Sequence, residues 1–174
     1  MNITFVTGGA RSGKSTFALN LARETQEAVT FIATAQALDE EMTERIQRHQ
    51  FERRSVENPN EWTTIEAPTD VKTALEKTKT RVVILDCLSL LVSNLMLEDK
   101  TEAEILERIR ATLETAKTRD LKMIVVSNEV GSGIVPEYPL GRAFRDVLGR
   151  CNQMVAAASS EAYLLVAGLA LRLK

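Results

Sequence analysis

The sequence predicts an α/β fold in which a mostly parallel sheet is covered by helices on both faces. Short apolar runs rich in β-branched residues alternate along the chain with segments of helical spacing. The first run leads into a glycine-rich loop, and a helical segment follows that loop. No internal repeat, low-complexity segment or linker interrupts the 174 residues, so we expect one domain over residues 1–174.

Five apolar runs predict buried strands, at residues 3–7, 29–33, 81–86, 123–127 and 162–167. Helical spacing predicts helices over residues 16–23, 70–79, 101–119 and 140–158. Residues 39–50 also have a helical pattern, with acids at the start and bases near the end. A polar loop then precedes an alternating segment at 62–66, which predicts an additional strand.

The segment 128–139 contains two glycines and two prolines and directly follows a buried run. Ligands in an open parallel sheet bind beyond the carboxyl ends of the strands. We therefore expect this loop to line a site.

Composition narrows the class of protein. The net charge is −2, without the clustered basic excess of a nucleic-acid-binding surface. The two cysteines, Cys87 and Cys151, are far apart and lack metal-ligand spacing, which favours reduced thiols. The chain starts without a signal-peptide pattern and contains no run of transmembrane length. We expect a cytoplasmic protein with no membrane span and no nucleic-acid partner.

One motif indicates nucleotide chemistry, because its residues match the pattern G-x-x-x-x-G-K-[ST] in full. These residues are Gly8, Gly9, Ala10, Arg11, Ser12, Gly13, Lys14 and Ser15. The glycines let successive backbone N–H groups point at phosphate oxygens, and the next helix adds its N-terminal dipole. Lys14 supplies positive charge to the β- and γ-phosphates, and the Ser15 hydroxyl is a ligand for Mg²⁺. The motif predicts a phosphate-binding loop.

Asp86 ends the apolar run 81–86. A carboxylate at the tip of a buried strand is the usual second magnesium-directed group beside such a loop. The alternative is that Asp86 caps a helix beginning near Leu88, since Asp is a favoured N-cap.

The single histidine, His49, has two interpretations. Leu38, Met42, Ile46 and His49 share one stripe of the predicted helix, which favours packing at the edge of the core. Arginines gather around it at positions 45, 48, 53 and 54. Cations hold an imidazole neutral and attract a triphosphate, and a neutral imidazole nitrogen is a competent nucleophile towards phosphorus. The residues alone leave both interpretations open.

Over essentially its whole length the chain resembles the bifunctional adenosylcobinamide kinase/adenosylcobinamide-phosphate guanylyltransferase family of cobalamin biosynthesis. The resemblance begins with the phosphate loop and continues through residues 32–35, 39–42, 45–49 and 62–68. Later blocks are residues 85–90, 127–131, 133–136 and 144–146, then Gly149, Asn152 and Gln153. Position 48 is Arg where some members have a second histidine, and the loop at 53–59 lacks the Arg-Pro pair common in the family.

The resemblance implies a RecA-like phosphate-loop fold, an oligomer that is typically a trimer, and a role for His49 as the guanylylated nucleophile. ATP or GTP would phosphorylate adenosylcobinamide, and GMP from GTP would pass through His49 to adenosylcobinamide phosphate. Lys14, Ser15 and Asp86 would serve the nucleotide and Mg²⁺. Further nucleotide-binding positions implied by the resemblance are Ala33, Thr34, Ala35, Gln50, Phe51, Glu52, Arg53 and Glu66.

Two other functions share the nucleotide features. A monofunctional small-molecule kinase would use the phosphate loop and give His49 a packing role. A non-catalytic nucleotide-binding module would bind nucleotide without turnover in the presence of a corrinoid.

Overall fold

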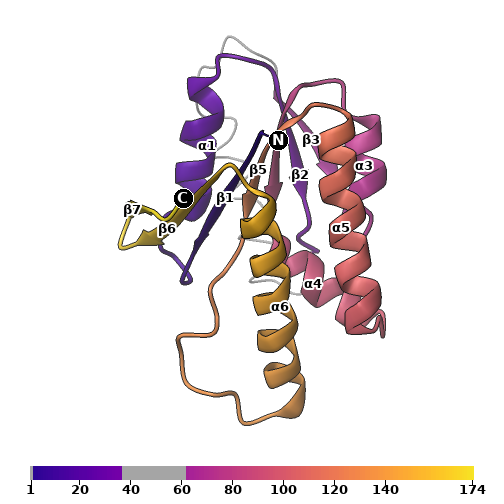
Figure 1. Ribbon diagram of the computed structural model, residues 1–174, viewed down its shortest axis with the longest axis vertical. Coiled ribbons are helices and arrows are strands. Elements are labelled where there is room, and N and C mark those ends of the chain that lie inside the picture. Colours follow the sequence, from indigo (N-terminus) through magenta and orange to yellow (C-terminus); the bar gives the residue numbers. More distant parts are fainter. Residues whose placement is uncertain (1, 37–61) are drawn as a thin grey trace.

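A computed structural model describes residues 2–36 and 62–174 of the chain (Figure 1). Within these ranges, one seven-stranded sheet has the strand order β3-β2-β4-β5-β1-β6-β7. The strands are β1 (Asn2–Gly8), β2 (Val29–Ala33), β3 (Trp62–Glu66), β4 (Val82–Asp86), β5 (Lys122–Val126), β6 (Glu161–Val166) and β7 (Leu169–Arg172). The helices are α1 (Lys14–Glu24), α3 (Val71–Lys77), α4 (Leu88–Leu97), α5 (Glu102–Thr118) and α6 (Pro139–Ala158).

The described sheet is parallel from β3 through β6, and its edge strand β7 runs antiparallel to β6. The predicted mostly parallel sheet is therefore confirmed. The six predicted strands all form, with ends that agree to within a residue. The strand β7 was not predicted. It follows a tight turn in which Ala167 and Gly168 have positive φ angles of 50° and 84°.

The four helices predicted in the described ranges also form, and local caps fix two of their starts. The Asp70 carboxylate accepts the Thr73 N–H at the start of α3. Thr101 and Glu104 form a reciprocal capping box at the start of α5. The N-cap of α4 is Cys87, so the alternative in which Asp86 caps this helix is wrong.

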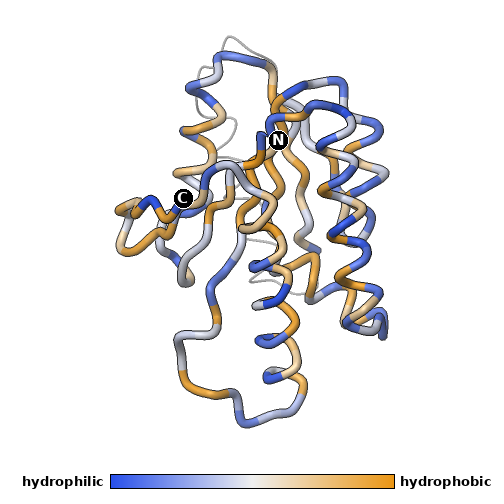
Figure 2. The backbone as a smooth tube through the Cα atoms, viewed as in Figure 1, coloured by the Kyte–Doolittle hydropathy of each residue, from blue (hydrophilic) through white to orange (hydrophobic). Residues whose placement is uncertain are grey.

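Alternate strand residues face opposite sides of the sheet and build two cores. On one side, Val83 and Leu85 pack with α3, α4, α5 and α6. On the other side, Val82 and Ile84 pack with α1. The prediction of helices on both faces is confirmed (Figure 1). Figure 2 shows that the central strands, which lie between these helices, are among the most hydrophobic segments of the chain.

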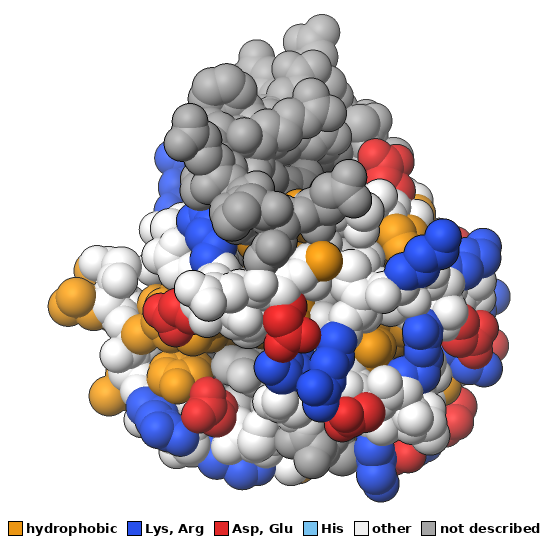
Figure 3. Space-filling model, turned by 90° about the horizontal axis from the view of Figure 1, so that it is seen from above, with side chains coloured by type: hydrophobic (Ala, Val, Ile, Leu, Met, Phe, Trp, Pro, Cys, Tyr) orange, Lys and Arg blue, Asp and Glu red, His pale blue; other side chains and the backbone are white. Residues whose placement is uncertain are grey.

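The outer surface mixes charges of both signs. On the face seen in Figure 3, Lys and Arg side chains lie interspersed with Asp and Glu. In the part of the chain that the structure describes, no helix combines the length and apolar character needed to cross a bilayer.

Both cysteines lie in the described ranges as buried thiols without a disulfide. Burial raises the pKa of the Cys151 thiol to about 12, and the nearby Glu102 carboxylate adds to the rise. This agrees with the prediction of reduced cysteines.

Candidate functional site

The phosphate-loop motif lies between β1 and α1, as the sequence predicts, and two of its three glycines, Gly8 and Gly13, occupy positions that disfavour other residues. Gly8 has a φ of 153°, and a Cβ there would approach the Leu165 carbonyl oxygen to 2.4 Å. Gly13 has a φ of 92° and occupies the N-cap position of α1. The loop leads directly from the carboxyl end of β1 to the N-terminus of α1, the arrangement in which backbone N–H groups and a helix dipole bind phosphate.

Lys14 and Ser15 open α1 at this loop. Lys14 is 7% exposed, and its ammonium donates to the carbonyl oxygen of Gly9 at the other side of the loop. Ser15 is half-buried in the first turn of the helix. The lysine side chain thus crosses the loop from the first residue of α1 to Gly9.

Two buried hydroxyls beside the loop have no hydrogen-bond partner among the described residues. They belong to Thr7, at the end of β1, and Ser12, inside the loop. Buried polar atoms are nearly always satisfied, so an unpaired pair at this place is typical of a site that takes a polar ligand or water.

Sheet register brings distant predicted residues together at the carboxyl edge of the strands. Asp86 at the tip of β4 pairs with Ala33 of β2, and Ala33 pairs in turn with Glu66 of β3. On its other side Asp86 pairs with Val126 of β5, which pairs with Val6 of β1. This row ends two residues before the phosphate loop begins at Gly8. Glu66 is exposed, whereas Ala33, Ala35 and Asp86 are half-buried.

Thr34 differs from its neighbours because it is completely buried. Its hydroxyl lies 2.8 Å from both the carbonyl oxygen and the N–H nitrogen of Cys87, donating to the first and accepting from the second. Thr34 lies at the carboxyl edge of the sheet, and its hydroxyl contacts are with the Cys87 backbone, which follows Asp86.

Five predicted site residues lie outside the described residues. They are His49, Gln50, Phe51, Glu52 and Arg53. The predicted helix over residues 39–50 lies there too.

A polar network that the sequence did not reveal crosses the same edge. The Ser127 hydroxyl donates to the Asn152 side-chain oxygen at 2.6 Å, and the Asn152 amide donates to the Asn128 carbonyl at 3.1 Å. The Asn128 amide then donates to the Ser89 hydroxyl, which lies 3.0 Å from the Cys87 sulfur. The available signal was the position of Ser127 and Asn128 directly after a buried strand.

The turn between β6 and β7 also touches the phosphate loop. The Gly168 N–H donates to the Ser12 carbonyl at 3.0 Å, and a Cβ on Gly13 would meet the Gly168 Cα at 3.3 Å. The Ala167-Gly168 pair between two apolar runs was a turn signal, but nothing in the sequence indicated its contact with Ser12.

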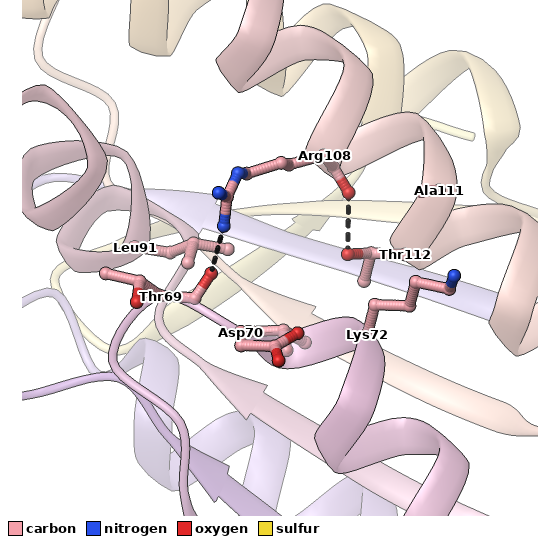
Figure 4. Close-up of a pocket in the computed structure, with 8 residues that line it drawn as sticks. Thr69, Asp70, Lys72, Leu91, Arg108, Ala111 and Thr112 are labelled. Atoms are coloured by element: carbon pink, nitrogen blue, oxygen red, sulfur yellow. Dashed lines mark hydrogen bonds between the residues drawn. The ribbon is translucent and has the colours of Figure 1, made fainter. Parts of the chain in front are cut away.

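A separate pocket of about 210 Å³ lies between α3, α4 and α5 (Figure 4). The Arg108 guanidinium reaches the Thr69 carbonyl at 3.5 Å, and the Thr112 hydroxyl donates to the Arg108 carbonyl at 2.8 Å. The first bond joins α5 to the turn before α3, and the second lies within α5. None of the sequence-predicted site residues lines this pocket.

Comparisons with known proteins agree with the site's chemistry. The family model described as cobinamide kinase / cobinamide phosphate guanyltransferase matches residues 4–173. The chain belongs to this family. It is thus a bifunctional cobinamide kinase and guanylyltransferase of adenosylcobalamin biosynthesis. This assignment replaces the monofunctional kinase and the non-catalytic module that the sequence left as alternatives.

Curated relatives support the same family over nearly full length. The bifunctional adenosylcobalamin biosynthesis protein CobU of Escherichia coli is 37% identical, across 97% of this chain and 98% of that protein. The protein CobP of Pseudomonas aeruginosa is 40% identical, across 97% of this chain and 95% of that protein.

Solved structures support the fold. The RadB recombinase matches with a TM-score of 0.54 at 16% identity, over 93% of this chain and 73% of that chain. A KaiC-like protein from Pyrococcus horikoshii matches with a TM-score of 0.52 at 11% identity, over 94% of this chain and 70% of that chain. The predicted RecA-like phosphate-loop architecture is confirmed.

Proposed function

We propose that the phosphate loop of residues 8–15 holds the nucleoside triphosphate for both reactions of this enzyme. The observation that supports this most directly is the geometry of the loop. Lys14 crosses the loop to the Gly9 carbonyl, and the buried Ser12 hydroxyl inside the loop has no hydrogen-bond partner among the described residues. All the predicted site residues that are described lie on or directly beside one sheet, so we also propose that residues 1–174 act as one catalytic domain.

In the kinase reaction, a hydroxyl on the aminopropanol arm of adenosylcobinamide attacks the γ-phosphorus of ATP or GTP. A new oxygen–phosphorus bond forms, the bond to the β–γ bridging oxygen breaks, the hydroxyl proton is lost to solvent, and the nucleoside diphosphate leaves. The protein contributes mainly position and positive charge to such a transfer. Lys14 and the start of α1 supply that charge here.

In the guanylyl transfer, the neutral imidazole of His49 attacks the α-phosphorus of GTP and pyrophosphate leaves. The nitrogen–phosphorus bond holds GMP as a phosphoramidate. A phosphate oxygen of adenosylcobinamide phosphate then attacks the same phosphorus, which releases His49 and gives adenosylcobinamide-GDP. We assign Gln50, Phe51, Glu52, Arg53, Glu66, Ala33 and Ala35 to the nucleotide surroundings of this step. Thr34, whose polar groups are bonded within the protein, supports the backbone beside them.

Ser15 and Asp86 have the donor chemistry that Mg²⁺ requires. A hydroxyl and a carboxylate are hard oxygen ligands, which this ion prefers over nitrogen and sulfur. Helix α1 begins at the carboxyl edge of β1 and packs against β4, the strand that Asp86 ends. Mg²⁺ bound there would neutralise charge on the phosphates, and the two residues would hold it beside the loop.

We further propose a cytoplasmic homo-oligomer, a trimer by the family resemblance. Support for self-association comes from β7, an edge strand whose Leu169 and Leu171 are 76% and 58% exposed. The mass measured by light scattering after size exclusion is expected to be that of three chains. A mass of one chain would contradict the oligomer.

The guanylyl step is tested with GTP labelled at the α-phosphate, incubated with Mg²⁺ and protein and then denatured. Label retained on the wild-type chain, stable in base, lost in acid and absent from His49→Ala would support the phosphoramidate. A His49→Ala protein that retains label at the wild-type level would overturn the role of His49.

A further inference from the structure

Thr34, directly after β2, uses its polar groups on the backbone around Asp86. The Thr34 N–H donates to the Asp86 carbonyl at 3.2 Å. The Thr34 hydroxyl donates to the Cys87 carbonyl and accepts the Cys87 N–H, both at 2.8 Å. Three hydrogen bonds from one residue thus fix the chain at Asp86 and at the residue that follows it.

A second layer fixes Thr34 itself. The Asn94 amide in α4 donates to the Thr34 carbonyl at 2.8 Å and to the Pro68 carbonyl at 2.9 Å. Thr34 is 0% exposed and Asn94 is 6% exposed, so water does not compete freely for these bonds. The N–H, the hydroxyl and the carbonyl of Thr34 are all engaged within the protein.

We propose that Thr34 is a positioning residue that orients the Asp86 carboxylate towards the metal–nucleotide complex, and that its side chain does not contact the nucleotide. The inference rests on the proposed magnesium role of Asp86. A carboxylate at a strand tip holds its direction only as well as its backbone is fixed, and partners of a metal ligand commonly set its affinity for the ion. Thr34 restrains this backbone from the β2 side.

Strand β2, which leads to Thr34, offers a matched control. Thr30 is 1% exposed, and its hydroxyl lies 2.6 Å from that of Thr78 and 3.1 Å from that of Thr63. Thr30 and Thr34 lie four residues apart, but Thr30 is near the amino end of β2, away from Asp86. Replacing either threonine by valine removes a bonded, buried hydroxyl with little change in shape.

The experiment measures Mn²⁺ binding by electron paramagnetic resonance, with a non-hydrolysable GTP analogue bound. Mn²⁺ accepts the same hard oxygen ligands as Mg²⁺. Thr34→Val is expected to weaken Mn²⁺ binding about tenfold or more, the usual effect of removing a partner of a metal ligand. Analogue binding in EDTA is expected to stay at the wild-type value. Thr34→Ser, which keeps the hydroxyl, is expected to restore most of the metal affinity.

Thr30→Val is expected to lower thermal stability and leave metal affinity unchanged. Unchanged Mn²⁺ affinity in Thr34→Val would overturn the proposal, as would an equal loss in Thr30→Val. Weaker analogue binding in EDTA would also overturn it, because Thr34 would then act on the nucleotide directly. If Thr34→Val does not fold, Asn94→Leu is used instead, because it removes the hydrogen bond from the Asn94 amide to the Thr34 carbonyl. Unchanged Mn²⁺ affinity in Asn94→Leu would then overturn the proposal.

Asp86→Asn separates this inference from the proposed function on which it rests. Unchanged Mn²⁺ affinity in Asp86→Asn would overturn the magnesium role of Asp86, and the positioning role with it. Weakened affinity in Asp86→Asn beside unchanged affinity in Thr34→Val would overturn the positioning role alone.

Discussion

Gly8 has no room for a side chain at the point where β1 turns into the phosphate loop. A Cβ would lie 2.4 Å from the Leu165 carbonyl oxygen and 2.8 Å from the Ser12 hydroxyl oxygen. The first neighbour is backbone of β6 and does not move without disturbing the sheet. Steric exclusion and a positive φ therefore both select glycine here.

We expect Gly8→Ala to lower the free energy of unfolding by about 1–3 kcal/mol through backbone strain, and to weaken nucleotide binding. Denaturant unfolding and nucleotide titration measure the two effects. Gly149→Ala is the matched control, because a Cβ there would have no neighbour within 4 Å and the residue is in the interior of α6. The free energy of unfolding of Gly149→Ala is expected to rise by about 0.5–1 kcal/mol. A Gly8→Ala protein with wild-type stability would contradict the steric argument.

At the scale of single residues, the sequence located the phosphate loop and the described residues at the strand ends, but not their contacts. The motif identified Lys14 and Ser15 because its spacing encodes a local structure, a strand, a curl and a helix. The burial of Thr34 was not predictable, since it depends on the backbone of Cys87. That residue follows the neighbouring strand β4 and is 53 residues away in the sequence. Spacing within one segment contains no information on such partners.

Helix and strand elements followed closely from periodicity. Helical spacing over residues 101–119 predicted α5, and Ile105, Ile109, Leu113 and Ala116, which recur along it every three or four residues, are all buried. The strand β7 was missed because its residues are all exposed and no alternation marks a buried side. Its pairing with β6 depends on the turn at Gly168, which is held against the phosphate loop by the bond to Ser12.

The capping box of α5 is expected to stabilise the start of that helix measurably. The Glu104 N–H donates to the Thr101 hydroxyl, and the Thr101 N–H donates to the Glu104 carboxylate at 2.8 Å. Hydrogen bonds from Thr101 also hold the pKa of Glu104 below its usual value. We expect Thr101→Ala to lower the free energy of unfolding by about 1 kcal/mol, measured by urea denaturation.

Thr118, at the other end of α5, is the control for Thr101. Its exposed hydroxyl donates to the Thr115 carbonyl one turn back. Thr118→Ala is expected to change stability by less than about 0.5 kcal/mol. Equal effects at Thr101 and Thr118 would show that the capping box contributes nothing measurable.

In the whole molecule, the parallel sheet brings the described site residues to one edge. The residues Glu66, Ala33 and Asp86 come from three strands and lie in one register row. This gathering was predictable, because carboxyl ends of parallel strands meet at one edge and the chain alternates strands with helices. The contact between Gly168 and Ser12 of the phosphate loop was not predictable, since these residues are far apart in the sequence.

If a single phosphate loop serves both phosphoryl transfer and guanylyl transfer, removing its lysine must impair both reactions. The direct test compares wild type and Lys14→Ala in two single-turnover assays, phosphoryl transfer to adenosylcobinamide and retention of α-label from GTP. Lys72→Ala is the control, because Lys72 is exposed on α3 and pairs with Glu76 at 3.6 Å. We expect Lys14→Ala to slow both transfers about a hundredfold or more, as loss of a charge-stabilising donor does, and Lys72→Ala to slow neither. A Lys14→Ala protein that loses phosphoryl transfer but retains α-label at the wild-type rate would contradict a single shared site.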